Sequence, residues 1–144
     1  MSSLLAAVSS KNFRESLMIL SASGGVHIKD KEFLHEILAD LHAQDPIELY
    51  IENGNEGVER TIRHWTESKG IHTMTIRPLW TVLPSPFRRR NEVAMNFLPD
   101  VVISAGEEPA AIDLLQRALK MKILVIRITQ KKGKLPHVRL LKPE

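Results

Sequence analysis

Apolar residues along this chain gather alternately in strand-length runs and in stripes spaced for one face of a helix. The runs fall at 16–22, 47–51, 71–80, 100–106 and 123–128, and the stripes fall at 30–44, 56–70, 89–98 and 107–122. Apolar runs of this length are typical of strands, and the most continuous of them fit buried parallel strands. Spacing by three and four predicts amphipathic helices. The pattern therefore predicts five strands alternating with four helices.

The first two helices have clear apolar stripes, and several helix ends are marked by suitable residues. The stripe residues are Leu34, Ile37, Leu38 and Leu41 in the first helix, and Val58, Ile62 and Trp65 in the second. Asp30 is suited to cap the start of the first helix, and Gly70 is suited to stop the second. Pro109 fits the first turn of the last helix. We expect both stripes to face the core.

The alternation of strands and helices predicts an α/β fold, a single three-layer Rossmann-like domain with a mainly parallel five-stranded sheet. A length of 144 residues suits one domain. We place this domain at 16–130. An N-terminal arm at 1–15 precedes it, and a basic C-terminal tail at 131–144, with a candidate edge strand at 137–141, follows it.

Four segments leave the predicted strands at the same edge of the predicted sheet. They read SASGG at 21–25, ENGNEG at 52–57, PLW at 78–80 and SAGEEP at 104–109. In open parallel sheets, ligands bind beyond the carboxyl ends of the strands. We therefore expect a ligand site where these four segments converge.

Small and polar residues in these segments are the first candidates for ligand binding. They are Ser21, Ser23, Gly24, Asn53, Gly54, Gly57 and Gly106. Free backbone N–H groups at a helix start suit an anion, and Asn55 is a candidate cap for the helix after ENGNEG. The same residues also fit plain Gly-assisted turns, and ENGNEG matches neither the dinucleotide fingerprint nor the phosphate loop. Both interpretations stay open.

Two adjacent acidic residues open the last predicted helix. Glu107 and Glu108 complement the helix dipole there, but their carboxylates would repel a phosphate at the same place. Because neighbouring residues on a helix point in different directions, a paired acid–base role is disfavoured. With Glu59 they are the candidate catalytic carboxylates if the protein is an enzyme.

Three larger side chains are also candidates at this edge. Arg90 is suited to pair bidentately with a phosphate or carboxylate, and Asn91 to hold a loop or a ribose hydroxyl. Trp80 follows the third strand, where an indole ring suits either a pocket wall or the core. The alternative interpretation of Arg88 to Arg90 is a solvent-exposed basic turn.

Composition narrows the classes of function. The net charge of +3 is concentrated at Arg88 to Arg90 and in the tail, which makes nucleic acid an alternative partner. No aromatic residues are interleaved with these basic residues as in single-strand binders. The chain has no cysteine and its six histidines form no metal motif, so we expect no metal or cofactor, and we expect His35 and His42 at the surface. No run is long enough to span a membrane, which fits a cytoplasmic protein.

With its motifs in this order, the chain resembles the SLOG superfamily of Rossmann-like proteins, and most of all its small single-domain YspA/YpsA-like members. NGNEGVE lies where those members have GGAxGAD, so that Gly54 and Gly57 match glycines, Asn53 replaces one, and Glu59 replaces the aspartate. Trp80 matches a tryptophan, and Arg90 and Asn91 match an RN pair. SASGG stands in place of GSR, and EEPAA stands in place of the phosphate-holding GGxGT loop.

The resemblance implies that the protein binds a nucleotide or nucleotide derivative, to sense or sequester it, at the carboxyl edge of the sheet. It also implies a homo-oligomer. One alternative is a nucleotide N-glycosidic hydrolase like the LOG-type phosphoribohydrolases, with a carboxylate that activates water or stabilises a cationic sugar. A second alternative is a nucleic-acid-binding or interaction module that uses the basic residues.

Overall fold

A computed structural model describes residues 18–25, 31–77, 86–131 and 134–142 of the chain. Its strands form one sheet in the order β3-β2-β1-β4-β5-β6. The strands are β1 (Met18–Ser23), β2 (Ile47–Glu52), β3 (His72–Thr75), β4 (Val101–Ala105), β5 (Leu124–Thr129) and β6 (His137–Leu141). Neighbouring strands from β3 to β5 pair in parallel, and β6 pairs antiparallel with β5. The mainly parallel α/β sheet expected from the sequence is therefore present.

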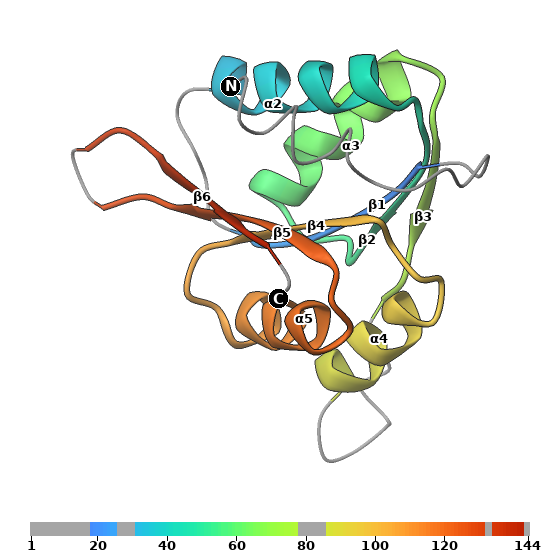
Figure 1. Cartoon of the computed structure of the whole chain (residues 1–144), viewed down its shortest axis with the longest axis vertical. Helices are drawn as coiled ribbons and strands as arrows, with labels where there is room; N and C mark the ends of the chain where they lie inside the picture. The colour runs from blue at the N-terminus through green and yellow to red at the C-terminus, as the bar shows by residue number, and fades with distance from the viewer. Residues whose placement is uncertain (1–17, 26–30, 78–85, 132–133, 143–144) are drawn as a thin grey trace.

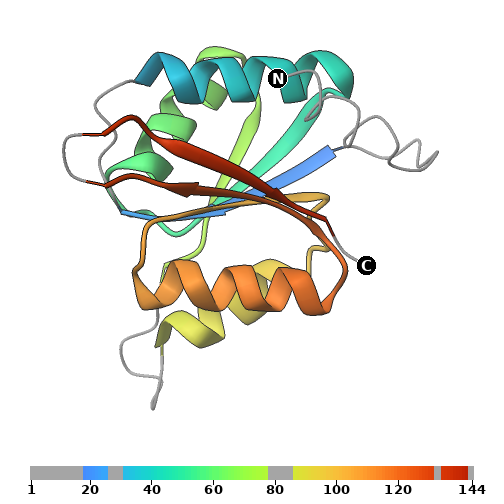
Figure 2. The same ribbon diagram turned by 60° about the vertical axis from the view of Figure 1, so that its left-hand side comes forward.

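Helices cover both faces of this sheet. They are α2 (Lys31–Gln44), α3 (Val58–Ser68), α4 (Pro86–Met95) and α5 (Pro109–Lys120). In Figure 1, α2 and α3 lie on one face while α4 and α5 lie on the other, and Figure 2 shows the same separation after rotation. Each helix connects two parallel strands, so its N-terminus lies near the carboxyl edge of the sheet.

The expected number of strands was wrong, because the sheet formed by the described residues has six strands and not five. The additional strand, β6, is the candidate edge strand at 137–141, and it pairs with β5 from Thr129↔His137 to Val125↔Leu141. Val138 and Leu140 pack against the main core, and this burial stabilises the pairing. The basic tail is thus partly a component of the sheet.

Several predicted boundaries shifted by a few residues. The helix expected at 89–98 is α4 at Pro86–Met95, and it ends before Leu98, whose φ of 53° is left-handed. The helix expected near Glu56 begins at Val58, because Gly57 before it has a φ of 80° that is not helical. Asn55 is therefore not the cap of that helix. The third strand is limited to His72–Thr75, and 78–80 lies outside the described residues.

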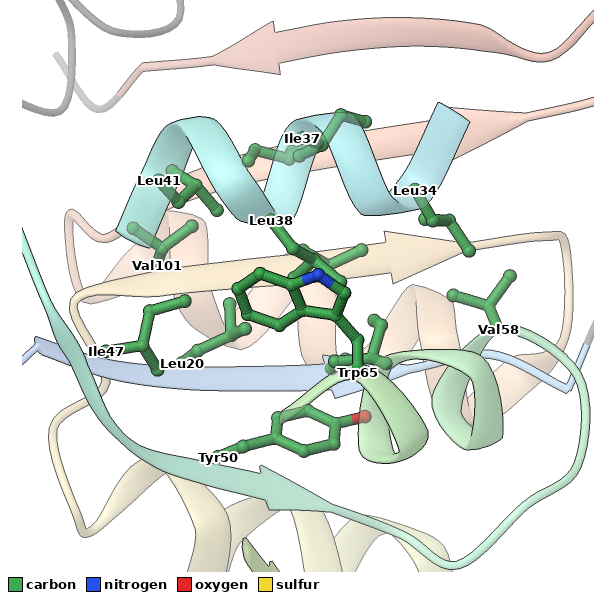
Figure 3. Packing of buried hydrophobic residues seen from close by; sticks show 14 of the residues in the cluster. Leu20, Leu34, Ile37, Leu38, Leu41, Ile47, Tyr50, Val58, Trp65 and Val101 are labelled. Carbon is green, nitrogen blue, oxygen red and sulfur yellow. The ribbon is translucent and has the colours of Figure 1, made fainter. Parts of the chain in front are cut away.

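The core expected from the two apolar stripes is confirmed. Leu34, Ile37, Leu38 and Leu41 of α2 are buried, as are Val58, Ile62 and Trp65 of α3. Figure 3 shows these two helices closing over β1, β2 and β4, with Trp65 next to Leu38 and Tyr50 below it. A second, smaller core around Leu114 lies under α5. The two cores pack the helices against the sheet.

His35 is exposed as expected, whereas His42 is half-buried and makes contacts within the fold. Its Nδ1 accepts a hydrogen bond of 2.9 Å from the backbone N–H of Ile47, and its ring meets the ring of Trp65 edge-on at 5.8 Å. The side chain therefore fixes the turn between α2 and β2. Heptad spacing alone could not reveal this contact, because it depends on how α2, α3 and the turn come together.

Some expectations fall on residues outside the described ranges. These are the N-terminal arm at 1–15, the cap at Asp30 and the position of Trp80. None of the helices in the described ranges has the length and apolar composition needed to cross a membrane.

Candidate functional site

The order of the strands reverses between β1 and β4. Chain order runs outward from β1 through β2 to β3 on one side, and from β4 through β5 on the other. In doubly wound sheets, the crevice outside the carboxyl ends of two such strands is the place where ligands bind. The segments after β1, β2 and β4 meet here, as the sequence predicted.

The first loop crosses the end of β4 in direct contact. A Cβ atom on Gly24 would lie 2.5 Å from the carbonyl oxygen of Ala105 and 2.8 Å from its Cβ. Both distances are shorter than real contacts of a Cβ atom. Gly24 is therefore required by the close approach of two backbone segments, which brings the first loop to the start of α5.

Replacing Gly24 with alanine should destabilise the fold. The new methyl group must push β1 and β4 apart at their carboxyl ends, where both strands are buried, and overpacking of this kind costs about 1–3 kcal/mol. Urea unfolding followed by circular dichroism measures the change. As the control, Gly70→Ala meets no atom within 4 Å and adds only the strain of its left-handed backbone. Equal effects of the two substitutions would contradict the close contact at Gly24.

Glu59 connects the first and second loops. This side chain, on the first turn of α3, is fully buried. Its carboxylate accepts hydrogen bonds from the backbone N–H of Gly24 at 2.9 Å and of Asn53 at 2.7 Å, and from the side-chain amide of Asn55 at 2.8 Å. In return the N–H of Glu59 donates to the carbonyl of Gly24 at 3.3 Å. Glu59 thus fixes the relative positions of β1, β2 and α3.

Burial raises the pKa of Glu59 above its ordinary value of 4.5 because it disfavours the charged form. The hydrogen bonds from Gly24, Asn55 and Asn53 act in the opposite direction, since they stabilise the carboxylate. The buried phenol of Tyr50 donates to the backbone carbonyl of Glu59 at 3.1 Å, and burial raises its pKa as well. The carboxyl edge therefore contains a buried acidic group held in one orientation.

Arg90 is a buried cation of the same region. It lies on α4, only 4% of its surface is exposed, and its Nε and Nη2 atoms have no hydrogen-bond partner. Burial lowers the pKa of the guanidinium, and the negative charge of Glu59 partly opposes that effect. Buried donors without partners are rare because each costs about 1–3 kcal/mol. The guanidinium of Arg90 therefore keeps two buried hydrogen-bond donors unused.

Asn91, the neighbour of Arg90, holds α4 against α5. Its amide nitrogen donates to the backbone carbonyl of Ala110 and to the carboxylate of Asp113, both at 3.0 Å. Asp113 also accepts a hydrogen bond from Arg117 at 2.8 Å. These bonds hold the middle of α4 against the N-terminal half of α5. The contacts of Asn91 are thus with the protein itself, and its Oδ1 is buried without a partner.

Replacing Asn91 with alanine should lower the free energy of unfolding by about 1–2 kcal/mol, because the carbonyl of Ala110 and the carboxylate of Asp113 each lose a donor. Thermal unfolding measures this loss. The neighbouring Glu92→Ala is the control, since Glu92 is exposed and its ion pair with Arg89 lies on the surface. A change at Asn91 no larger than that at Glu92 would show that these bonds do not stabilise the helix pair.

The two glutamates before α5 point in different directions, as expected. Glu108 accepts the backbone N–H of Gly25 with both carboxylate oxygens, each at 3.0 Å. Glu107, whose side chain is 80% exposed, pairs with Arg127 of β5 at 3.0 Å. Arg127 also donates to Ser104 at 3.1 Å. Only Glu108 lies against the first loop, so the two carboxylates form no acid–base pair.

The second loop is held by hydrogen bonds of its own. The amide of Asn53 donates to the hydroxyl of Ser23 at 2.9 Å, which joins the ends of β1 and β2. The N–H of Gly54 donates to the buried carboxylate of Glu52 at 3.3 Å. Glu52 also pairs with Arg63 at 2.8 Å and accepts the hydroxyl of Thr75 at 2.9 Å.

Sequence reasoning missed Glu52 and Arg63, as well as Ser104 and Arg127. A buried acidic residue that ends an apolar strand is a usable signal, since Glu52 directly follows the run IELYI. Arg127 similarly interrupts the apolar run of β5. The partners of both residues come from distant segments, so the sequence could not name them.

The remaining candidates lie at the same edge or close to it. Ser21 is buried within β1, Gly57 precedes the first residue of α3, and the N–H of Gly106 donates to the carbonyl of Ile128 at 3.1 Å. The alternative interpretation of 88–90 as an exposed basic turn is wrong for Arg90, which is buried. Arg88 and Arg89 are exposed, and Arg89 pairs with Glu92. Across the described ranges, no three His, Asp or Glu side chains lie close enough to hold a metal ion.

Comparison of the chain with models of protein families, and with individual curated proteins, found no match.

Proposed function

We propose that this protein binds a nucleotide or nucleotide derivative at the carboxyl edge of the sheet, through an anionic group of the ligand held by Arg90. The proposed fold is a divergent three-layer Rossmann-like domain of the SLOG type. Strand order and the reversal between β1 and β4 support such a domain. The adjacent positions of Arg90 and Asn91, with Glu59 beneath the first loop, agree with the resemblance of the motifs.

The observation that carries this proposal is the unpartnered guanidinium of Arg90. Nε and Nη2 are both buried and both lack an acceptor. A guanidinium offers these nitrogens as a planar fork that suits a phosphate or a carboxylate. Burial disfavours the charged form of the Arg90 guanidinium, and the attraction of Glu59 only partly opposes this effect. An incoming anion would therefore stabilise the buried positive charge.

In this proposal the loops after β1 and β2 shape the ligand site but donate few hydrogen bonds to the ligand. The N–H groups of Gly24 and Asn53 already donate to Glu59, and that of Gly25 donates to Glu108. A phosphate therefore cannot be cradled by these backbone groups while the carboxylates remain in place. A side chain, Arg90, takes that role.

A thermal-shift screen with nucleoside monophosphates, nucleosides and ADP-ribose tests the proposal. A ligand that binds the folded state at a hundred times its Kd should stabilise it by about 2.7 kcal/mol. Nucleosides should stabilise less than the matching monophosphates, because they lack the anion for Arg90. No stabilisation by any of these compounds at millimolar concentration would contradict nucleotide binding.

A further inference from the structure

Glu108 occupies a position that would otherwise suit an anion of a ligand. It precedes the first residue of α5, yet its side chain caps no N–H of that helix. The carboxylate instead crosses to the first loop, where the N–H of Gly25 lies 3.0 Å from each oxygen. A Cβ atom on Gly25 would meet this carboxylate at 3.3 Å. The N–H of Gly25 therefore already binds an anion, and the anion belongs to the protein.

Neighbouring backbone donors are occupied in the same way. Glu59 accepts from Gly24, and Glu52 accepts from Gly54. Beside β4, the N–H of Gly106 donates to a strand carbonyl. Arg90 contrasts with them, because it has two buried nitrogens without a partner. At this edge the guanidinium of Arg90 therefore has unused donors, whereas the backbone N–H groups of the loops already donate to carboxylates or, at Gly106, to a carbonyl.

We propose that Glu108 determines specificity: it fills the anion position of the first loop and limits the site to ligands with one anionic group, excluding diphosphates. This inference rests on the proposed function, in which Arg90 holds one anionic group of the ligand. A second phosphate at Gly25 would have to displace the carboxylate or lie beside it. The like charge of the carboxylate would repel a phosphate placed there, and the half-buried position of Glu108 reduces the screening of that repulsion.

The first test follows the amide of Gly25 by NMR, with inorganic phosphate as the probe. In Glu108→Ala the amide signal should move upfield because it loses its acceptor, and phosphate should return it downfield in a saturable manner. In the wild type, phosphate should leave this signal in place. Glu107→Ala removes the same charge one residue away and should create no phosphate site at Gly25. An amide of Glu108→Ala that does not respond to phosphate would overturn the inference.

The second test compares AMP with ADP by calorimetry. The wild type should bind AMP more tightly than ADP, and Glu108→Ala should improve the affinity for ADP relative to AMP by about tenfold or more, since removing a like charge of this kind is worth at least about 1.4 kcal/mol. Glu108→Gln removes the charge but keeps an acceptor for the N–H of Gly25, so it is the control in case Glu108→Ala does not fold. It should show part of the increase in affinity for ADP relative to AMP.

The outcomes separate the two proposals. Binding of AMP that depends on Arg90, with no change in preference in either Glu108 variant, would overturn the role of Glu108 and leave the proposed function standing. If neither nucleotide binds the wild type, the proposed function fails for these compounds. The specificity inference then fails with it, and the response of the Gly25 amide to inorganic phosphate decides only whether Glu108 fills an anion position at the first loop.

Discussion

Replacing Glu59 with alanine is expected to lower the free energy of unfolding by about 3–5 kcal/mol, the usual result of breaking a buried charged network by removing one partner. The substitution deprives the N–H groups of Gly24 and Asn53 and the amide of Asn55 of their acceptor. It also leaves Arg90 without the negative charge that partly compensates its burial. Urea unfolding followed by circular dichroism measures the loss.

Glu67→Ala is the matched control, because Glu67 is an exposed glutamate on the same helix. Its removal should change the stability by no more than about 0.5 kcal/mol. Glu59→Ala would contradict the account if its effect were as small as that of Glu67→Ala, since the carboxylate would then not hold the two loops together.

The raised pKa of Glu59 gives the same prediction a dependence on pH. The folded state binds this proton more tightly than the unfolded state, so the contribution of Glu59 to stability is full below pH 4.5 and decreases as the pH rises through the raised pKa. The side chain of Gln in Glu59→Gln cannot titrate, so this variant lacks the pH-dependent contribution to stability. The difference in stability between the wild type and Glu59→Gln should therefore shrink with rising pH across that window, and a constant difference would refute the raised pKa.

Replacing Arg90 with methionine is expected to weaken AMP binding by about thirtyfold or more, because losing one partner of a buried charge pair costs about 2–5 kcal/mol. Stability without ligand should remain the same or rise by about 1–2 kcal/mol, since two buried donors without partners disappear. Loss of binding combined with unchanged or higher stability is the pattern of a residue retained for its ligand.

Arg89→Met is the control for this substitution. Arg89 is exposed on the same turn and pairs with Glu92 on the surface. Calorimetry with AMP and thermal unfolding should both give values close to those of the wild type. Arg90→Met would contradict the account in either of two ways: by retaining AMP affinity, or by losing more than about 2 kcal/mol of stability, which would indicate a structural partner for the guanidinium.

The overall architecture was predictable because its signals are local. The stripe of Leu34 to Leu41 and the stripe of Val58, Ile62 and Trp65 identify helices and also show which faces are buried. Once the strands are parallel, the segments after them must meet at one edge, so the convergence of these segments followed from the fold. The sixth strand was harder to predict, since HVRLL is short and depends on pairing with β5.

The internal chemistry of the site was not predictable, because it arises from residues far apart in the sequence. Glu59 and Gly24 are separated by 35 positions, and Glu108 and Gly25 by 83. Within its helix Glu59 is one acidic residue in a first turn, which ordinarily complements the helix dipole at the surface. Only the meeting of α3, β1 and β2 makes it a buried acceptor for three donors.

The most direct test of the central claim, that Arg90 holds the anionic group of a nucleotide, is the NMR signal of its Nε–H group during titration with AMP. The signal is identified by its absence in Arg90→Met. The account predicts that AMP shifts it downfield, slows exchange of its proton with water, and does so with the same Kd as calorimetry. AMP binding that leaves the Nε–H signal unchanged would contradict the claim and place the nucleotide elsewhere.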